Sequence, residues 1–432
     1  MLYTFVRPIA RLGLKAFYRK IYVSNADRMP RDKPVFLASN HPTAFIEPCL
    51  MACFLDRPLF FLVRGNLFQK KVFDTLLRSL NMLPIYRRKD GGYSKLKNNY
   101  ETFQSVFSAL HDNRTVMILI EGSTIQVKRL RPLKKGTARM AFGAIEAYDL
   151  EEVYIVPGGV NFTYAERPRS EVMIEIGEPV KAKDYLEDYV HNANKAIMDL
   201  TNAVRPALED CLVHVEDPEN DALVEGLLQM HRSTFVEPRF PIFSIDPARF
   251  EMEKGVAEKV NASDPDALSE LREAVADYME HLGQFGLEDR TLMQRKQPPP
   301  AWPLWLGFPI FLLGYAFNKP LTLPGKHLSE TKVKTHEFIM PVRWAASLGV
   351  YLLTTIAVVV VTLATQWGWL PLWYVGLLLA GHFSLYYLEY RTEYRQHQRL
   401  KIVPEKQLEA LLQRRALVME LYNNLKPKYE SA

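Results

Sequence analysis

The stretch FLASNHPTAFIEPCL, residues 36–50, joins a short apolar run to His41 and Pro42 and then to a single carboxylate, Glu47. The apolar run at residues 35–39 has the length and composition of a buried strand. Pro42 favours the first turn of a helix, because its ring fixes φ and its missing N–H is not needed there. We therefore expect a strand that ends in a loop carrying His41, with a helix beginning there.

The spacing of His41 and Glu47 raises the question of what the pair does. Residues six apart on a continuous helix are rotated by about 240° and point to different faces. In a loop, by contrast, Glu47 can fold back onto the imidazole. A carboxylate bonded to one ring nitrogen fixes the tautomer and leaves the other nitrogen free to accept a proton as a general base. A histidine near a glutamate is also common as a purely structural pair, so the spacing by itself leaves both interpretations open.

Short apolar runs alternate with longer helical patterns along the first half of the chain. The runs are VFLAS, LFFLV, MLPIY, TVMILI, VYIVP and VMIEI. Between TVMILI and VYIVP, apolar residues recur at helical spacing and predict a crossover helix between neighbouring strands. The alternation predicts an α/β catalytic domain over residues 31–182, with a mixed, mostly parallel sheet flanked by helices.

The N-terminal residues carry a basic stripe. Arg7, Arg11, Lys15 and Arg19 recur every four residues among apolar and aromatic side chains. This pattern predicts an amphipathic helix in residues 1–30, with the composition of a helix that lies at a membrane surface. An ordinary surface helix with a solvated basic edge is the alternative, and the wide apolar face favours membrane contact.

The second half of the chain changes in character twice. Residues 183–300 hold helical patterns without a catalytic motif and end in the proline-rich run RKQPPP, so we expect a helical second region and a linker. Residues 301–390 are strongly apolar. Within them, residues 345–365 form an uncharged stretch long enough to cross a hydrocarbon core of roughly 30 Å, and residues 370–387 follow as an antiparallel partner. These segments predict a C-terminal membrane hairpin, with a buried hairpin of a soluble protein as the alternative.

A further apolar segment precedes the hairpin. Residues 302–317 are too short to cross easily and contain Pro309, so we expect this segment to enter the membrane and return. With this topology, one side of the membrane holds the basic residues that precede the segment, those in the loop 319–343 and those after Tyr387. The positive-inside rule assigns that side, with the catalytic domain, to the cytoplasm. The pattern of residues 391–432 predicts an amphipathic helix in a cytosolic tail.

Composition excludes several classes of function. A net charge of +5 over 432 residues does not indicate nucleic acid as a partner. The chain has neither a glycine-rich phosphate loop nor a dinucleotide fingerprint. Cys49, Cys53 and Cys211 are odd in number and lack the spacing of metal ligands, so we interpret them as reduced core thiols and expect no metal site.

Three more groups of residues follow expected strands. Arg87 and Arg88 come directly after MLPIY, where guanidinium groups can hold a phosphate through paired hydrogen bonds. Glu121 and Gly122 follow TVMILI, and Pro157 closes VYIVP. Each group also fits a solvated turn, a helix cap or simple turn chemistry. Open α/β sheets bind ligands beyond the carboxyl ends of their strands, so the shared position of the groups favours a binding site.

The ordered blocks NHPTAFIEP, MLPIYRR, IEGS and IVPGGV resemble those of the glycerolipid acyltransferases, which acylate glycerol-3-phosphate and lysophosphatidate. The resemblance covers roughly residues 1–182. In the common form of the family the first block is His-x4-Asp. Here Glu47 lies one place further on, a spacing similar to that of the longer glycerol-3-phosphate or dihydroxyacetone-phosphate branch.

The third block departs from the family pattern in two ways. Ile120 stands where a proline is usual, and Thr124 and Ile125 stand where an arginine often follows. A nearby basic residue is therefore expected to supply the missing charge. The candidates are Lys128, Arg129, Arg131, Lys134 and Lys135.

The resemblance implies roles for individual residues. His41 would remove the proton from the acceptor hydroxyl, and Glu47 would orient the imidazole. The expected substrate-binding residues are Arg87, Arg88, Glu121, Gly122, Ser123 and Lys135.

The implied activity is that of a membrane-bound enzyme of phospholipid biosynthesis. It would move a fatty acyl group from acyl-CoA or acyl-carrier protein to a hydroxyl of glycerol-3-phosphate or 1-acylglycerol-3-phosphate, in contact with membrane lipids. No covalent enzyme intermediate, metal or cofactor is expected, because the thioester is itself a co-substrate. The alternative is a catalytically inactive membrane protein on the same fold that binds lipid or acts as a scaffold.

Overall fold

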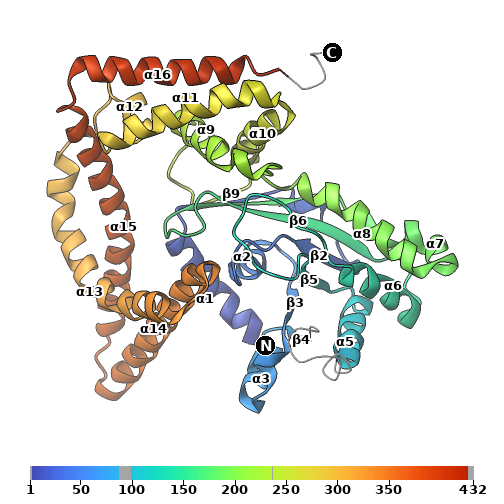
Figure 1. Ribbon diagram of the computed structural model, residues 1–432. Helices are drawn as coiled ribbons and strands as arrows, with labels where there is room; N and C mark the ends of the chain where they lie inside the picture. Colours follow the sequence, from blue (N-terminus) through green and yellow to red (C-terminus); the bar gives the residue numbers. More distant parts are fainter. Residues whose placement is uncertain (1, 87–98, 236, 427–432) are drawn as a thin grey trace. The chain divides into compact units, whose positions relative to one another are not determined.

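The computed structural model describes residues 2–86, 99–235 and 237–426 (Figure 1). The chain divides into two compact units. The first contains Met1–Val213, Arg239–Phe250 and Lys334–Pro341, and the second contains His214–Pro238, Glu251–Val333 and Val342–Ala432.

The first unit is built on one mixed sheet. Its strands are β1 (Lys20–Ser24), β2 (Val35–Ser39), β3 (Leu59–Arg64), β4 (Met82–Ile85), β5 (Thr115–Leu119), β6 (Tyr154–Phe162), β7 (Glu171–Ile176), β8 (Val180–Lys181) and β9 (Phe243–Ser244). They lie in the order β4-β3-β5-β2-β6-β7-β1-β9, and β8 pairs with β6. Strand β6 is antiparallel to β7 and β8, whereas the remaining pairings among these strands are parallel. The predicted α/β class with a mixed, mostly parallel sheet is confirmed.

Helices cover both faces of this sheet. They are α1 (Leu2–Phe17), α2 (Ile46–Phe54), α3 (Lys71–Ser79), α5 (Asn99–His111), α6 (Gly136–Tyr148), α7 (Leu186–His191) and α8 (Ala193–Glu209). Phe36 of β2 is buried in a core with Phe142 of α6 and Leu200 of α8. Neighbouring strand residues point to opposite faces, and Leu37 accordingly lies with Met51 of α2 beside Gly158. The crossover helix expected between the fourth and fifth apolar runs is α6.

The N-terminal helix is shorter than the sequence predicted. It ends at Phe17, and Lys20–Ser24 form β1, a fully buried strand that pairs in parallel with β7. The prediction of a helix over residues 1–30 was therefore wrong beyond Phe17. Arg19 continues the basic period by chance, but it lies beyond the helix and its guanidinium pairs with buried Glu171. The β-branched and aromatic composition that follows it favours the strand.

The second unit is helical, as expected. Its helices include α9 (Asp221–Thr234), α11 (Pro265–Gln284), α12 (Asp289–Met293), α13 (Trp302–Lys332), α15 (Leu370–Leu400) and α16 (Glu405–Asn423). Two more, α10 (Ala248–Ala262) and α14 (His336–Thr365), begin in the first unit and continue in the second. Helix α11 packs against both α9 and α16.

One helix in the described part of the chain, α14, is long and apolar enough to cross a membrane by length and composition. Helix α13 begins where the segment 302–317 was expected but continues without a break to Lys332. The membrane placement of segments 302–317 and 370–387 stays a prediction.

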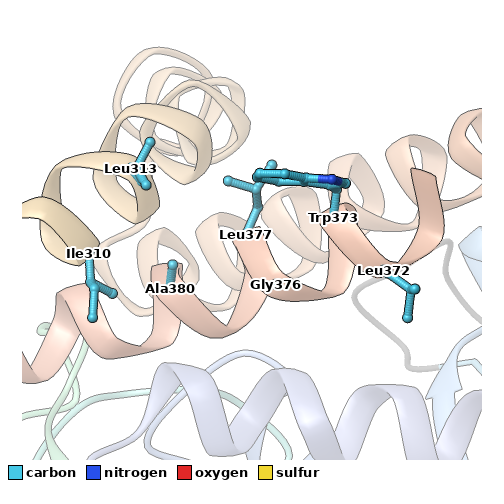
Figure 2. Close-up of a pocket in the computed structure, with 7 residues that line it drawn as sticks. All are labelled: Ile310, Leu313, Leu372, Trp373, Gly376, Leu377 and Ala380. Atoms are coloured by element: carbon cyan, nitrogen blue, oxygen red, sulfur yellow. The ribbon is translucent and has the colours of Figure 1, made fainter. Parts of the chain in front are cut away.

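Helices α13 and α15 pack closely along their length. A Cβ at Gly314 would overlap Ala380, and a Cβ at Gly381 would overlap Asn318. Glycine at these positions therefore permits the close approach of the two helices. Asn318 donates to the carbonyl of Leu377, 2.9 Å away, and accepts from the Tyr351 hydroxyl of α14 at 2.9 Å. Beside this contact lies an apolar pocket of about 310 Å³ (Figure 2). Its lining residues are Ile310, Leu313, Leu372, Trp373, Gly376, Leu377 and Ala380.

Strand β6 lies against the chain that leaves α8, and Gly159 makes this approach possible. A Cβ there would overlap the carbonyl oxygen of Cys211. The segment cannot easily retreat, because Asn161 donates to the same carbonyl at 2.9 Å and accepts from the N–H of Val213 at 2.8 Å.

We predict that Gly159→Ala lowers the protection of β6 amides against hydrogen exchange by about 1–3 kcal/mol, the usual cost of overpacking. Gly136→Ala is the matched control, because a Cβ at Gly136 meets nothing within 4 Å and alanine favours the helix. Equal protection in the two variants would contradict the packing described here.

Candidate active site

The parallel register brings two loops to one edge of the sheet. Ser39, the last residue of β2, lies between Leu119 of β5 and Gly158 of β6. Strand β6 continues beyond this point, and Asn40 pairs with its backbone. The Asn40 amide donates to the carbonyl of Val160 at 3.0 Å and accepts from the N–H of Val160 at 2.9 Å. The chain therefore leaves the sheet immediately before His41.

His41 is held by its backbone and by its ring. Its backbone N–H donates to Glu121 at 2.9 Å. Its Nε2 lies 2.7 Å from the Thr124 hydroxyl oxygen, and its Nδ1 lies 3.7 Å from Oε1 of Glu47. The His41 side chain is 12% exposed. The ring thus faces a carboxylate with one nitrogen and a hydroxyl with the other.

Glu47 folds back towards the loop as the sequence suggested, but its hydrogen bonds go to Thr43. Both carboxylate oxygens accept from this residue, one from the backbone N–H and one from the hydroxyl at 2.8 Å. The separation of 3.7 Å from His41 is too long for the expected hydrogen bond. The side chain is fully buried, so its negative charge acts on the imidazole through a medium of low dielectric constant.

The same hydrogen bonds explain where α2 begins. Glu47 lies in the first turn of α2, which starts at Ile46 rather than at Pro42. Because Glu47 holds the N–H of Thr43, residues 41–45 stay in a loop that keeps His41 outside the helix.

Glu121 joins this loop to the one that follows β5. The carboxylate is 4% exposed. One of its oxygens accepts from the backbone N–H of Arg131 at 2.9 Å, and the other accepts from His41 and from the Arg131 guanidinium at 2.7 Å. Gly122 has a φ of +69°, which favours glycine and turns the chain back after the glutamate.

Of the five basic candidates, Arg131 places its guanidinium against Glu121 and Ser123 of the third block. Besides Glu121, its guanidinium binds the hydroxyl of Ser123 at 2.8 Å and the carbonyl of the same residue. Lys135 instead lies exposed at the start of α6. Of the remaining expected substrate-binding residues, Arg87 and Arg88 lie outside the described residues.

The two cysteines of α2 are chemically quiet. Burial raises the pKa of Cys49 to about 12, with smaller contributions from Cys53 and Glu47. Burial raises the pKa of Cys53 to about 11, against the lowering effect of Arg7 and Arg11. Since the thiolate is the nucleophilic form, neither thiol is suited to covalent catalysis at neutral pH.

The described residues contain no group of three or more His, Cys, Asp or Glu side chains placed to hold a metal ion. The chemistry that the site supports is that of a histidine base with a hydroxyl at its Nε2.

Residues 20–161 match the model of the Acyltransferase family, over a stretch that runs from β1 into β6 and includes His41, Glu47 and Glu121. This stretch is therefore similar to an acyltransferase domain.

Two yeast proteins are similar to the chain. Glycerol-3-phosphate O-acyltransferase 2 of Saccharomyces cerevisiae is 28% identical over 239 residues, which cover 55% of this chain and 31% of the yeast protein. Glycerol-3-phosphate O-acyltransferase 1 of the same organism is 24% identical over 245 residues, which cover 54% and 32%. The chain therefore spans about a third of the length of these relatives.

Among solved structures, the 1-acyl-sn-glycerophosphate (LPA) acyltransferase PlsC of Thermotoga maritima superposes with a TM-score of 0.31 and 18% sequence identity. The match covers 45% of this chain and 78% of the PlsC chain.

We predict that Arg131→Ala lowers the free energy of unfolding of the first unit by about 3 kcal/mol, because it leaves a buried carboxylate with only backbone donors. The exposed Lys135 provides the matched control, and Lys135→Ala should change the free energy of unfolding by less than about 0.5 kcal/mol. Pulse proteolysis in urea measures this unit, whereas fluorescence does not, because all six tryptophans follow residue 301. Equal losses in the two variants would show that the Arg131 contacts do not hold the site together.

Proposed function

We propose that this chain transfers a fatty acyl group from a thioester donor to a hydroxyl of glycerol-3-phosphate or 1-acylglycerol-3-phosphate. The observation that carries the proposal is the hydroxyl oxygen of Thr124, 2.7 Å from Nε2 of His41, with Glu47 on the other side of the ring. A hydroxyl at that distance is in position to give its proton to the imidazole. The acyltransferase domain and the names of the two yeast relatives support this reaction and acceptor class.

This geometry supports the following reaction. The acceptor hydroxyl takes the place of the Thr124 hydroxyl at Nε2, and its oxygen attacks the carbonyl carbon of the thioester as its proton passes to His41. The carbon–sulfur bond then breaks, and the departing sulfur receives the proton from the imidazolium. The products are an ester and a free thiol. The buried carboxylate of Glu47 stabilises the imidazolium between these two steps.

The co-substrate in this proposal is acyl-CoA or acyl-carrier protein, and no further cofactor takes part. Both cysteines of α2 are protonated at neutral pH, which favours direct transfer over an acyl-enzyme intermediate.

The proposal places the enzyme in a membrane with the acyltransferase domain on the cytoplasmic side. Helix α14 supplies an apolar span, and the most apolar part of that helix is unburied. The basic residues that surround the apolar segments favour the cytoplasmic side for the domain.

We predict that His41→Ala lowers the rate of thiol release from acyl-CoA in the presence of acceptor by at least about 100-fold, the usual contribution of a general base. Glu47→Gln should cost less, because the base remains and only its negative partner is lost. His191→Ala, an exposed histidine at the end of α7, is the control.

A folded His41→Ala protein that turns over at the wild-type rate would end the proposal. Acceptor binding without any thiol release by the wild-type chain would point instead to an inactive lipid-binding protein.

Arg87 is proposed as a ligand of the acceptor phosphate, on the basis of its place after β4 and of the family resemblance. Arg87→Ala should then raise the KM for the acceptor by about 10- to 100-fold, because a charge-assisted contact contributes roughly 1.5–3 kcal/mol. The KM for the thioester should change little. Arg87→Lys should recover only part of the loss, since a point charge replaces the planar fork. If transfer to an acceptor analogue without phosphate slows equally, the assignment is wrong.

A further inference from the structure

The segment that follows β3 exposes large apolar side chains. It consists of a short 3-10 helix, Gly65–Phe68, followed by α3. No residue of α3 is buried. Four residues, here called the α3 patch, have exposed fractions between 43% and 79%. They are Leu67, Val72, Phe73 and Leu76.

The large apolar side chains of α3 gather on one exposed side of the helix. Val72, Phe73 and Leu76 lie within an arc of about 100° on a helical projection, whereas Asp74 and Arg78 lie on the other side. Asp74 and Arg78 pair with each other at 2.8 Å. The guanidinium of Arg78 also lies over the ring of buried Phe68, 5.8 Å from its centre. The apolar side of α3 therefore faces away from the body of the unit, whereas Asp74 and Arg78 lie on another side of the helix, where the Arg78 side chain is 47% exposed.

The charges around the patch are of one sign. Arg64, Lys70 and Lys71 are exposed beside it. Residues 57–73 contain no acidic side chain, and the next one along the chain, Asp74, is already paired. Exposed apolar side chains with a basic border are the composition of a segment that lies in the interface of an anionic bilayer.

A second helix of the same unit has the same character and is attached to the same strand. Helix α1 exposes Phe5 and Leu12, each 71% exposed, beside its basic stripe. The Tyr3 hydroxyl of α1 accepts a hydrogen bond from Leu59, the first residue of β3, at 3.2 Å. Strand β3 thus connects two amphipathic elements of the first unit.

We propose that the α3 patch inserts into the surface of an anionic lipid bilayer and docks the first unit on it. This contact is separate from any span formed by α14. Because β3 and β5 are parallel, the patch follows the carboxyl end of β3, the same edge of the sheet at which Glu121 follows β5. The patch therefore holds against lipid the edge of the sheet that carries His41. The inference concerns position only and does not depend on acyl transfer.

The test uses the full chain in vesicles of phosphatidylcholine with phosphatidylglycerol. A single fluorophore is attached through Val72→Cys in the patch or, as the matched control, through Arg78→Cys on the opposite side of the same helix. The native thiols give little background labelling, since Cys53 and Cys211 are buried and burial raises the pKa of Cys49 to about 12. The unsubstituted chain measures that background.

We expect the label at position 72 to shift its emission to the blue, to lose most of its quenching by aqueous iodide and to gain quenching by a spin-labelled lipid. The label at position 78 should stay accessible to iodide. Phe73→Glu with Leu76→Glu should abolish the difference between the two positions, and vesicles of phosphatidylcholine alone should reduce it.

Equal iodide quenching at the two positions would overturn the proposal. Shielding of position 72 that disappears when the chains are diluted to one per vesicle would also overturn it, because it would show that a second copy of the chain covers the patch. Since neither readout involves a thioester, these outcomes are distinct from a failure of the proposed activity.

Discussion

The buried carboxylate of Glu121 ties together the two loops that form the site. A carboxylate removed from water requires compensation by donors and by positive charge. Here the compensation comes from the backbone of His41 on one side and from Arg131 on the other. Satisfying one buried carboxylate therefore fixes the backbone at His41. The positive φ of Gly122 turns the chain so that Thr124 comes to the ring.

The parallel sheet makes this contact possible. Strands β2 and β5 end side by side, so the residues that follow them, separated by some 80 positions in the sequence, lie within hydrogen-bond distance. Asn40 adds a second constraint, because its amide pairs with the backbone of β6 and fixes the direction in which the chain leaves the sheet. The hydrogen bonds from Thr43 to Glu47 further restrict the conformation of the loop.

Much of the sheet could be predicted from sequence, because buried strands leave a direct trace in apolar runs. All six runs became strands, and the crossover helix formed where its periodicity indicated. Strand β1 was not predicted, because Arg19 continues the four-residue spacing of basic residues although the helix ends at Phe17.

In the site, sequence brought attention to His41, Glu47 and Glu121, which resemble family blocks. Thr43, Thr124 and the contacts of Arg131 could not be predicted in the same way. Their roles depend on how two loops fold on each other, and loop conformation leaves no periodic signal. Arg131 was one of five basic candidates, and only the direction of its guanidinium singles it out.

In the proposed reaction, His41 takes a proton from the acceptor hydroxyl at the place where Thr124 now lies. An experimental structure of the chain with glycerol-3-phosphate bound tests it most directly. We expect an acceptor hydroxyl oxygen within about 2.6–3.2 Å of Nε2 of His41, with the Thr124 hydroxyl displaced from that nitrogen. A bound acceptor whose hydroxyls lie away from the imidazole, with the contact between His41 and Thr124 intact, would contradict it.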